Sequence, residues 1–150
     1  MGLLSNLTEE IKNAMRARDS LRLEALRAIK TGVLLAQTSG PGTEELNNDE
    51  AIKLLQRLVK QRKESATIYR EQNRADLADP EEAQAEIITS FLPAQLSETE
   101  VEKIISEIII KTGADSMKDM GKVMGMASGK LAGKADGKLI ANLVKQKLGV

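Results

Sequence analysis

The sequence predicts an all-α protein, with an N-terminal helical bundle followed by a small C-terminal three-helix domain. Apolar residues recur at intervals of three and four and almost never alternate, which is the period of helices. The strand-like apolar run at 108–110 lies inside such a helical period. Pro93 interrupts the pattern, so we assign residues 1–92 to the bundle and residues 93–150 to the C-terminal domain.

The first two helices are expected at 3–15 and 21–34, where leucine, isoleucine and alanine recur on one face. A short turn at 18–20 separates them. The segment Ser-Gly-Pro-Gly-Thr at 39–43 is predicted to be a loop, because glycine and proline break helices.

A long third helix is expected to start at a cap, Asn48 or Asp49, and to run to about Asn73. The fourth helix is predicted to begin at Asp79, with Pro80 in its first turn. Aspartate is a favoured N-cap, and proline is tolerated at the first helical position. The predicted buried face of this helix consists of Ala83, Ile87, Ile88, Phe91 and Leu92.

Three helices are expected in the C-terminal domain. The segment Ser-Glu-Thr-Glu at 97–100 is a capping box that starts the first, and Gly113 ends it. The second begins at Ser116, and the third runs from Asp136 to near Leu148.

The composition of the 150 residues excludes several kinds of chemistry. Cysteine and histidine are both absent, so the chain has no thiolate nucleophile, imidazole base or Cys/His zinc site. Paired carboxylates occur at helix starts, where the helix dipole accounts for them, so we predict no catalytic residue, metal or cofactor.

No apolar run is long enough to span a bilayer, and the first ten residues are acidic. We therefore predict a soluble, cytoplasmic protein without a membrane partner.

The net charge of zero conceals a basic C-terminal end. The chain has 22 Lys and Arg and 22 Asp and Glu. Residues 1–92 carry a net charge of −2, whereas residues 111–150 contain eight lysines and three aspartates, a net charge of +5. Local charge determines which partner a surface attracts.

Glycine and lysine recur at intervals of four in this basic end. The glycines are at 121, 125, 129, 133 and 137. We interpret the stretch as two helices joined by a turn, because placing all five glycines inside helices would be costly. The candidate RNA-binding residues are Lys118, Lys122, Lys130, Lys134 and Lys138 as phosphate ligands, with Gly121, Gly125, Gly133 and Gly137 permitting close approach. The alternative is that the lysines are merely solvated and the glycines allow tight packing.

A second basic run lies in the long helix. Arg57, Lys60, Arg62 and Lys63 form a candidate secondary basic patch, which Arg70 and Arg74 extend. The alternative is ion pairing with glutamates of the same helix or the next. Those glutamates are Glu64, Glu71, Glu81, Glu82 and Glu86.

Several segments together resemble one known family. In the C-terminal part they are Asp-Met-Gly-Lys-Val-Met-Gly at 119–125, Gly-Lys-Ala-Asp-Gly at 133–137 and Leu-Ile-Ala-Asn-Leu-Val-Lys at 139–145. Earlier segments are Val-Lys-Gln-Arg-Lys-Glu-Ser at 59–65, Tyr69, Asn-Arg-Ala-Asp-Leu at 73–77 and Phe-Leu-Pro-Ala-Gln-Leu at 91–96. In order and spacing they resemble the GatB/YqeY family, and nearly the whole chain is similar to free-standing YqeY-like proteins.

The resemblance implies an all-α fold and a link to tRNA. The same module forms the tail of the B subunit of the tRNA-dependent amidotransferase, which converts glutamate or aspartate mischarged on tRNA into glutamine or asparagine. That tail contacts the tRNA body, away from the chemistry. Free-standing relatives often carry the label of a carbon–nitrogen ligase with glutamine as amido donor.

We therefore expect a non-catalytic accessory module that binds tRNA or another structured RNA. An amidotransferase or a tRNA-charging enzyme is a further expected partner. The alternatives are a protein-interaction module without RNA binding, and a component with ligase activity of its own.

Overall fold

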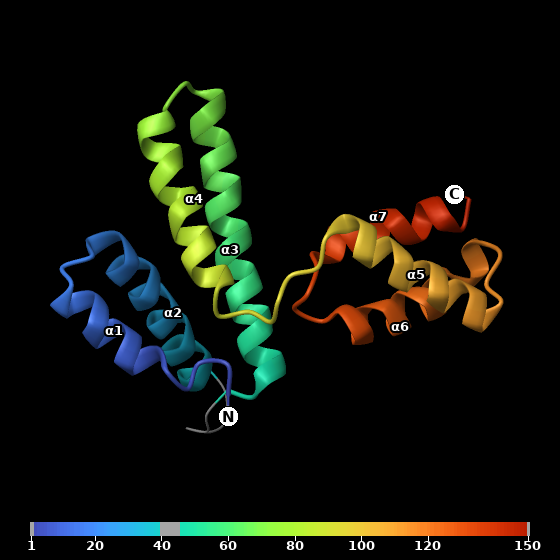
Figure 1. The fold of residues 1–150 in the computed structure, drawn as a ribbon, viewed down its shortest axis with the longest axis horizontal. Coiled ribbons are helices and arrows are strands. Elements are labelled where there is room, and N and C mark those ends of the chain that lie inside the picture. The colour runs from blue at the N-terminus through green and yellow to red at the C-terminus, as the bar shows by residue number, and fades with distance from the viewer. Residues whose placement is uncertain (1, 40–45, 150) are drawn as a thin grey trace. The chain divides into compact units, whose positions relative to one another are not determined.

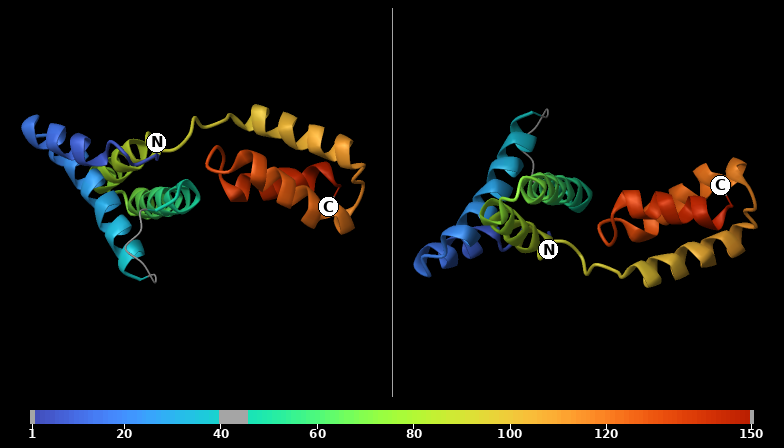
Figure 2. Two further views of the ribbon diagram at one scale, coloured as in Figure 1. Left: turned by 90° about the horizontal axis from the view of Figure 1, so that it is seen from below. Right: turned by 90° about the horizontal axis from the view of Figure 1, so that it is seen from above.

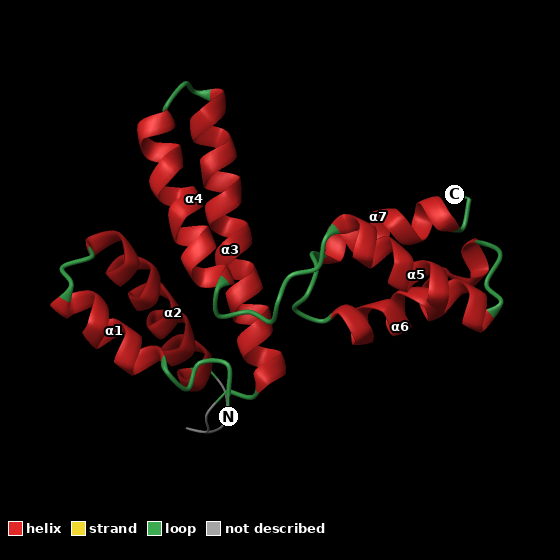
Figure 3. Cartoon of the chain, viewed as in Figure 1, coloured by secondary structure: helices red, strands yellow, loops and turns green. Residues whose placement is uncertain are grey.

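A computed structural model of the protein describes residues 2–39 and 46–149, and every regular element in these ranges is a helix (Figure 3). The predicted all-α class is thus confirmed. The chain divides into two compact units, Met1–Leu92 and Pro93–Val150 (Figure 1). Each unit has its own aliphatic core.

The first unit contains four helices: α1 (Leu7–Arg16), α2 (Ser20–Thr38), α3 (Asn48–Glu71) and α4 (Ala75–Thr89). The helices α3 and α4 form a long hairpin, α2 packs against both, and α1 packs against α2 (Figure 1). Leu26, Ile29, Leu55 and Ile88 are fully buried between them. Burial of these side chains supplies the main driving force for folding of this unit.

Local signals explain most of the helix starts in this unit. Arg18 adopts a left-handed backbone conformation (φ 55°) in the predicted turn, and the Asp19 side chain accepts a hydrogen bond from the Arg22 amide at 3.1 Å. Asn47 and Glu50 form a complete capping box at the start of α3, one residue before the predicted cap. Of the predicted loop at 39–43, residues 40–43 lie outside the described residues.

The predicted start of the fourth helix was wrong, because α4 begins at Ala75 rather than after Asp79. Asn73 reverses the chain with φ 60°, and the Ala78 amide already donates to the Arg74 carbonyl at 3.0 Å. Pro80 is therefore the sixth residue of α4, exposed on its surface. Of the predicted buried face, Ile88 and Phe91 are buried, whereas Ala83, Ile87 and Leu92 are half-buried.

One glycine in this unit is explained by internal packing. A Cβ added to Gly32 of α2 would lie 2.6 Å from Leu54 Cδ1 of α3. Since Leu54 is 4% exposed, it has little room to move. Gly32 therefore allows α2 and α3 to approach each other closely.

The second unit contains α5 (Glu98–Thr112), the 3-10 helix η1 (Met117–Asp119), α6 (Met120–Leu131) and α7 (Gly137–Lys147). The three α-helices all contact one another and lie side by side (Figure 2). The Ser97 hydroxyl caps α5 by accepting from the Glu100 amide at 3.2 Å, and Gly113 ends it with φ 68°. The predicted starts near Ser116 and at Asp136 also match the structure.

Candidate nucleic-acid interface

The helix α6 has one buried face and one exposed face that is rich in glycine. Val123, Ala127 and Leu131 are fully buried in the core of the second unit. The opposite side of the helix is exposed, and we call it the bare face of α6. It consists of Gly121, Gly125, Ser128 and Gly129.

Internal packing does not explain the glycines of the bare face. A Cβ added to Gly121, Gly125 or Gly129 would meet no atom within 4 Å, and none of the three needs a positive φ. Each glycine in a helix interior costs roughly 1 kcal/mol relative to alanine. No packing contact within the described residues therefore compensates for the helix stability that these three glycines cost.

The two later glycines have different surroundings. Gly133 is buried in the turn before α7, adopts φ 74°, and its carbonyl accepts a hydrogen bond from the Gln95 side-chain amide. Its role is therefore structural, because an L-residue adopts this backbone conformation only with strain. Gly137 is the first residue of α7 and lies in open space.

The five candidate lysines are all exposed and lie on three helical elements and one turn. Lys118 is in η1, Lys122 and Lys130 are in α6, Lys134 is in the turn, and Lys138 is in α7. Among the described residues, no carboxylate lies within ion-pair distance of any of them, whereas Lys147 pairs with Glu102 at 2.9 Å. Their charges are thus available to an external anion.

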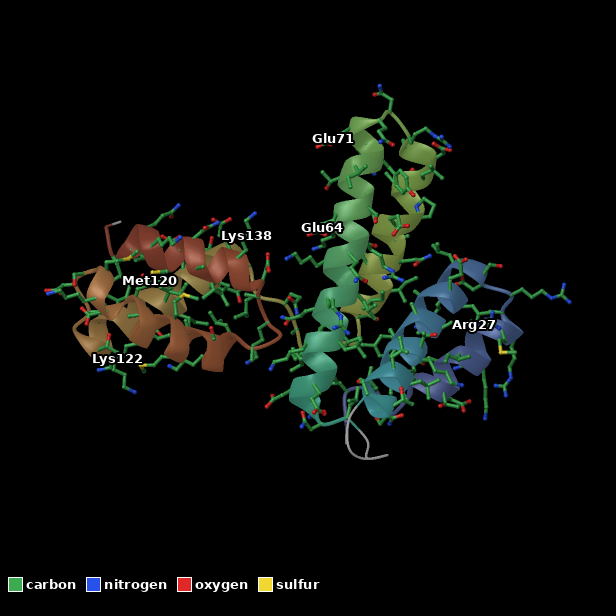
Figure 4. All side chains as sticks on the ribbon, turned by 180° about the vertical axis from the view of Figure 1, so that it is seen from behind. Arg27, Glu64, Glu71, Met120, Lys122 and Lys138 are labelled. Atoms are coloured by element: carbon green, nitrogen blue, oxygen red, sulfur yellow. The ribbon has the colours of Figure 1, made fainter. Side chains whose placement is uncertain are left out.

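The structure divides these lysines into groups instead of aligning them in one stripe. Lys122 adjoins the glycines of the bare face, and Lys118 precedes it by about one turn. Lys134 and Lys138 lie with Gly137 at the N-terminal end of α7, where the Asp136 side chain accepts from the Lys138 amide at 3.4 Å. Figure 4 shows Lys122 and Lys138 on opposite edges of the second unit. The turn at 132–136 interrupts the helical spacing on which a single stripe would depend.

In the secondary basic patch, Arg62 differs from its neighbours because it is half-buried and bonded internally. Its Nε donates to Gln84 Oε1 of α4 at 3.1 Å, and its Nη1 donates to the Leu58 carbonyl at 3.2 Å. Gln84 in turn donates to Glu24 of α2 at 3.1 Å. Arg62 therefore links α3 to α4, and Gln84 extends the hydrogen bonding to α2. In contrast, Arg57, Lys60 and Lys63 remain exposed.

Ion pairing, the alternative for the basic run, is confirmed at Arg70. Its guanidinium donates to Glu82 at 2.7 Å and to Asp79 at 2.8 Å, both on α4. The hydrogen bond to Glu82 is the main cause that raises the pKa of Arg70, and the same bond lowers the pKa of Glu82. Arg74 likewise lowers the pKa of Asp76 by hydrogen bonding to it at 3.0 Å.

Sequence reasoning did not include Gly129 or Ser128 among the candidate residues, although both belong to the bare face. The signal was present, since Gly121, Gly125 and Gly129 are spaced by four and share one side of a helix. In the structure α6 continues to Leu131.

Within the described residues, no three acidic side chains gather as a metal site would require. No helix in those ranges combines the length and the apolar character needed to cross a bilayer. The groove between α3 and α4 lies in the first unit and contains none of the C-terminal lysines.

The chain is similar to fungal proteins named "Altered inheritance of mitochondria protein 41, mitochondrial". It is 32% identical to that of Lachancea thermotolerans over 109 residues, 71% of this chain and 57% of the relative. It is 33% identical to that of Clavispora lusitaniae over 105 residues, 68% of this chain and 60% of the relative. The chain thus spans less than two thirds of these relatives.

The predicted cytoplasmic location was wrong by this comparison, because the names of these relatives place them in mitochondria. The prediction depended on overall composition and on the acidic first ten residues. Neither property determines the compartment in which a folded domain works.

A model of the family described as "Yqey-like protein" matches residues 4–148, which include every helix of both units. The match agrees with the resemblance noted in the sequence. The chain therefore belongs to the YqeY-like protein family.

Proposed function

We propose that the second unit binds tRNA or another structured RNA through the bare face of α6 and the lysines around it. In this role the protein is a non-catalytic accessory module, related to the tail of the tRNA-dependent amidotransferase. The observation that carries the proposal is the exposure of three helical glycines that no internal contact requires.

The bare face lets a bulky ligand come close to the α6 backbone. With no Cβ at three positions, a phosphodiester chain can approach the backbone there directly. Lys118 and Lys122 lie at the same end of the helix. Contacts of this kind with phosphates position a nucleic acid without reading its bases.

The charge of this segment supports an anionic partner. Residues 111–150 carry a net charge of +5, and the five candidate lysines have no carboxylate partner in the described structure. The chain has one Phe, one Tyr and no Trp, so base stacking contributes little. Recognition by shape and backbone therefore suits a folded RNA better than an unpaired strand.

Fluorescence anisotropy of labelled tRNA with the full chain, at several salt concentrations, tests the proposal. Reversing the charge of Lys118, Lys122 and Lys130 to Glu should abolish binding that the native chain shows at low salt. Reversal of Lys103, Lys111 and Lys145 to Glu is the matched control, because these are three exposed lysines of α5 and α7 outside the candidate set. No binding at low salt, or equal binding by the triple variant, would reject the proposal.

A second candidate is docking of a partner protein helix on the bare face. The same uncovered glycines favour it, since they let two helix axes approach closely. Such a complex would survive nuclease treatment and high salt, whereas an RNA complex would not. Amide transfer by the chain alone is tested separately, by supplying glutamine and mischarged tRNA to the purified protein.

A further inference from the structure

A groove lies along the hairpin of α3 and α4 in the first unit. It is an open groove of about 590 Å³, with Ala66 and Ala85 in its floor and with Lys63, Glu82 and Glu86 in its walls. The proposed RNA-binding surface does not include this groove, because the residues of that surface belong to the second unit.

The groove exists because the hairpin has small residues at this level. Ala66 and Ala85 are each 2% exposed, whereas the neighbouring layers of the hairpin contain Leu55, Val59 and Ile88. Thr67 and Thr89, which also line the groove, donate their hydroxyl hydrogens to carbonyls one turn earlier in their own helices. Methyl groups and aliphatic stems thus form a shallow surface that another helix could contact.

Two opposite charges in the groove walls lack partners. Arg70 bridges α3 and α4 by binding Glu82 and Asp79. One level further along the hairpin, Lys63 and Glu86 both line the groove, yet neither forms an ion pair within the described residues. An occupant with a carboxylate over Lys63 and an ammonium over Glu86 would satisfy both.

We propose that this groove is a docking surface for a second copy of the chain. A two-fold axis parallel to the hairpin, lying in the contact plane, places α3 of each copy over α4 of the other. The arrangement is self-complementary, as a two-fold contact must be. It brings Lys63 of each copy to Glu86 of the other, and the two hairpins together form an antiparallel four-helix bundle.

Charge swapping tests this dimer by sedimentation velocity over a range of concentrations of the full chain. The native chain should show a reversible monomer–dimer equilibrium. Lys63→Glu alone and Glu86→Lys alone should each weaken it by about tenfold or more, because like charges then meet twice across the axis. When the two variants are mixed, both cross-pairs become opposite in sign, so a heterodimer should form that neither variant forms with itself.

Matched controls change the same charges outside the groove. Lys60→Glu and Glu64→Lys alter exposed residues of α3 that do not line it, and neither should affect the equilibrium. Figure 4 shows Glu64 on the side of α3 turned away from α4. Circular dichroism checks that all variants remain helical. A native chain that stays monomeric, or a mixture that gains no heterodimer, overturns the proposal.

Discussion

At the scale of single residues, Gly125 and Gly133 differ in whether the fold requires a glycine. Gly125 of the bare face lies in open space, so Gly125→Ala should raise the free energy of unfolding by about 0.5–1 kcal/mol. The same substitution should weaken RNA binding, because the added methyl group lies where we place the phosphate backbone. Urea unfolding and anisotropy measure the two effects on one variant.

The control for this prediction is Gly133→Ala. Gly133 has φ 74° and is buried, so alanine there should lower the free energy of unfolding. A Gly125→Ala protein that is more stable and binds RNA as well as the native chain would leave the bare face without a function in RNA binding.

The ion pair between Arg70 and Glu82 predicts a dependence of stability on pH. The pKa of Glu82 is held below its ordinary value of 4.5 in the folded state, mainly by the hydrogen bond from Arg70. Its stabilising contribution is thus complete above pH 4.5 and is lost as the pH falls through the lowered pKa. The native chain should exceed Glu82→Gln in stability at neutral pH, and this difference should shrink in acid. A difference that persists at the lowest pH would contradict the assignment.

At the scale of elements, Pro80 distinguishes the observed α4 from the predicted one. A proline at the first helical position is favourable, but Pro80 is the sixth residue and cannot donate to the Asp76 carbonyl. Pro80→Ala should therefore stabilise the protein by about 1–2 kcal/mol, since the restored hydrogen bond outweighs the gain in unfolded-state entropy. A destabilising effect in thermal or urea unfolding would favour a helix start at Asp79.

The sequence was informative wherever a signal is local. The cap at Ser97 and the glycine terminator at 113 need only neighbouring residues, and both occur in the structure. The start of α4 could not be predicted in this way, because Asp79 binds Arg70 across the hairpin instead of capping a helix. A capping pattern does not reveal such a distant partner.

The candidate interface was predictable only in part, for the same reason. Spacing of four identified the glycines and lysines, but it could not show that the turn at 132–136 separates Lys122 from Lys138. Nor could it show that Arg62 is bonded to Gln84, since this contact depends on how α3 packs against α4. Periodicity places residues on a face, and tertiary packing determines what covers that face.

At the scale of the whole molecule, the RNA binding that we propose for this neutral chain depends on local charge, which makes salt a quantitative probe. Each phosphate neutralised should contribute roughly −0.7 to −0.9 to the slope of log K against log salt. Replacing Lys118 or Lys122 by Glu should reduce the magnitude of this slope by about one each and weaken binding alike for RNAs of different sequence. Lys103→Glu on α5 carries the same change of total charge and should leave the slope unaltered. If Lys103→Glu changes the slope as much as Lys122→Glu does, net charge governs binding and the bare face does not.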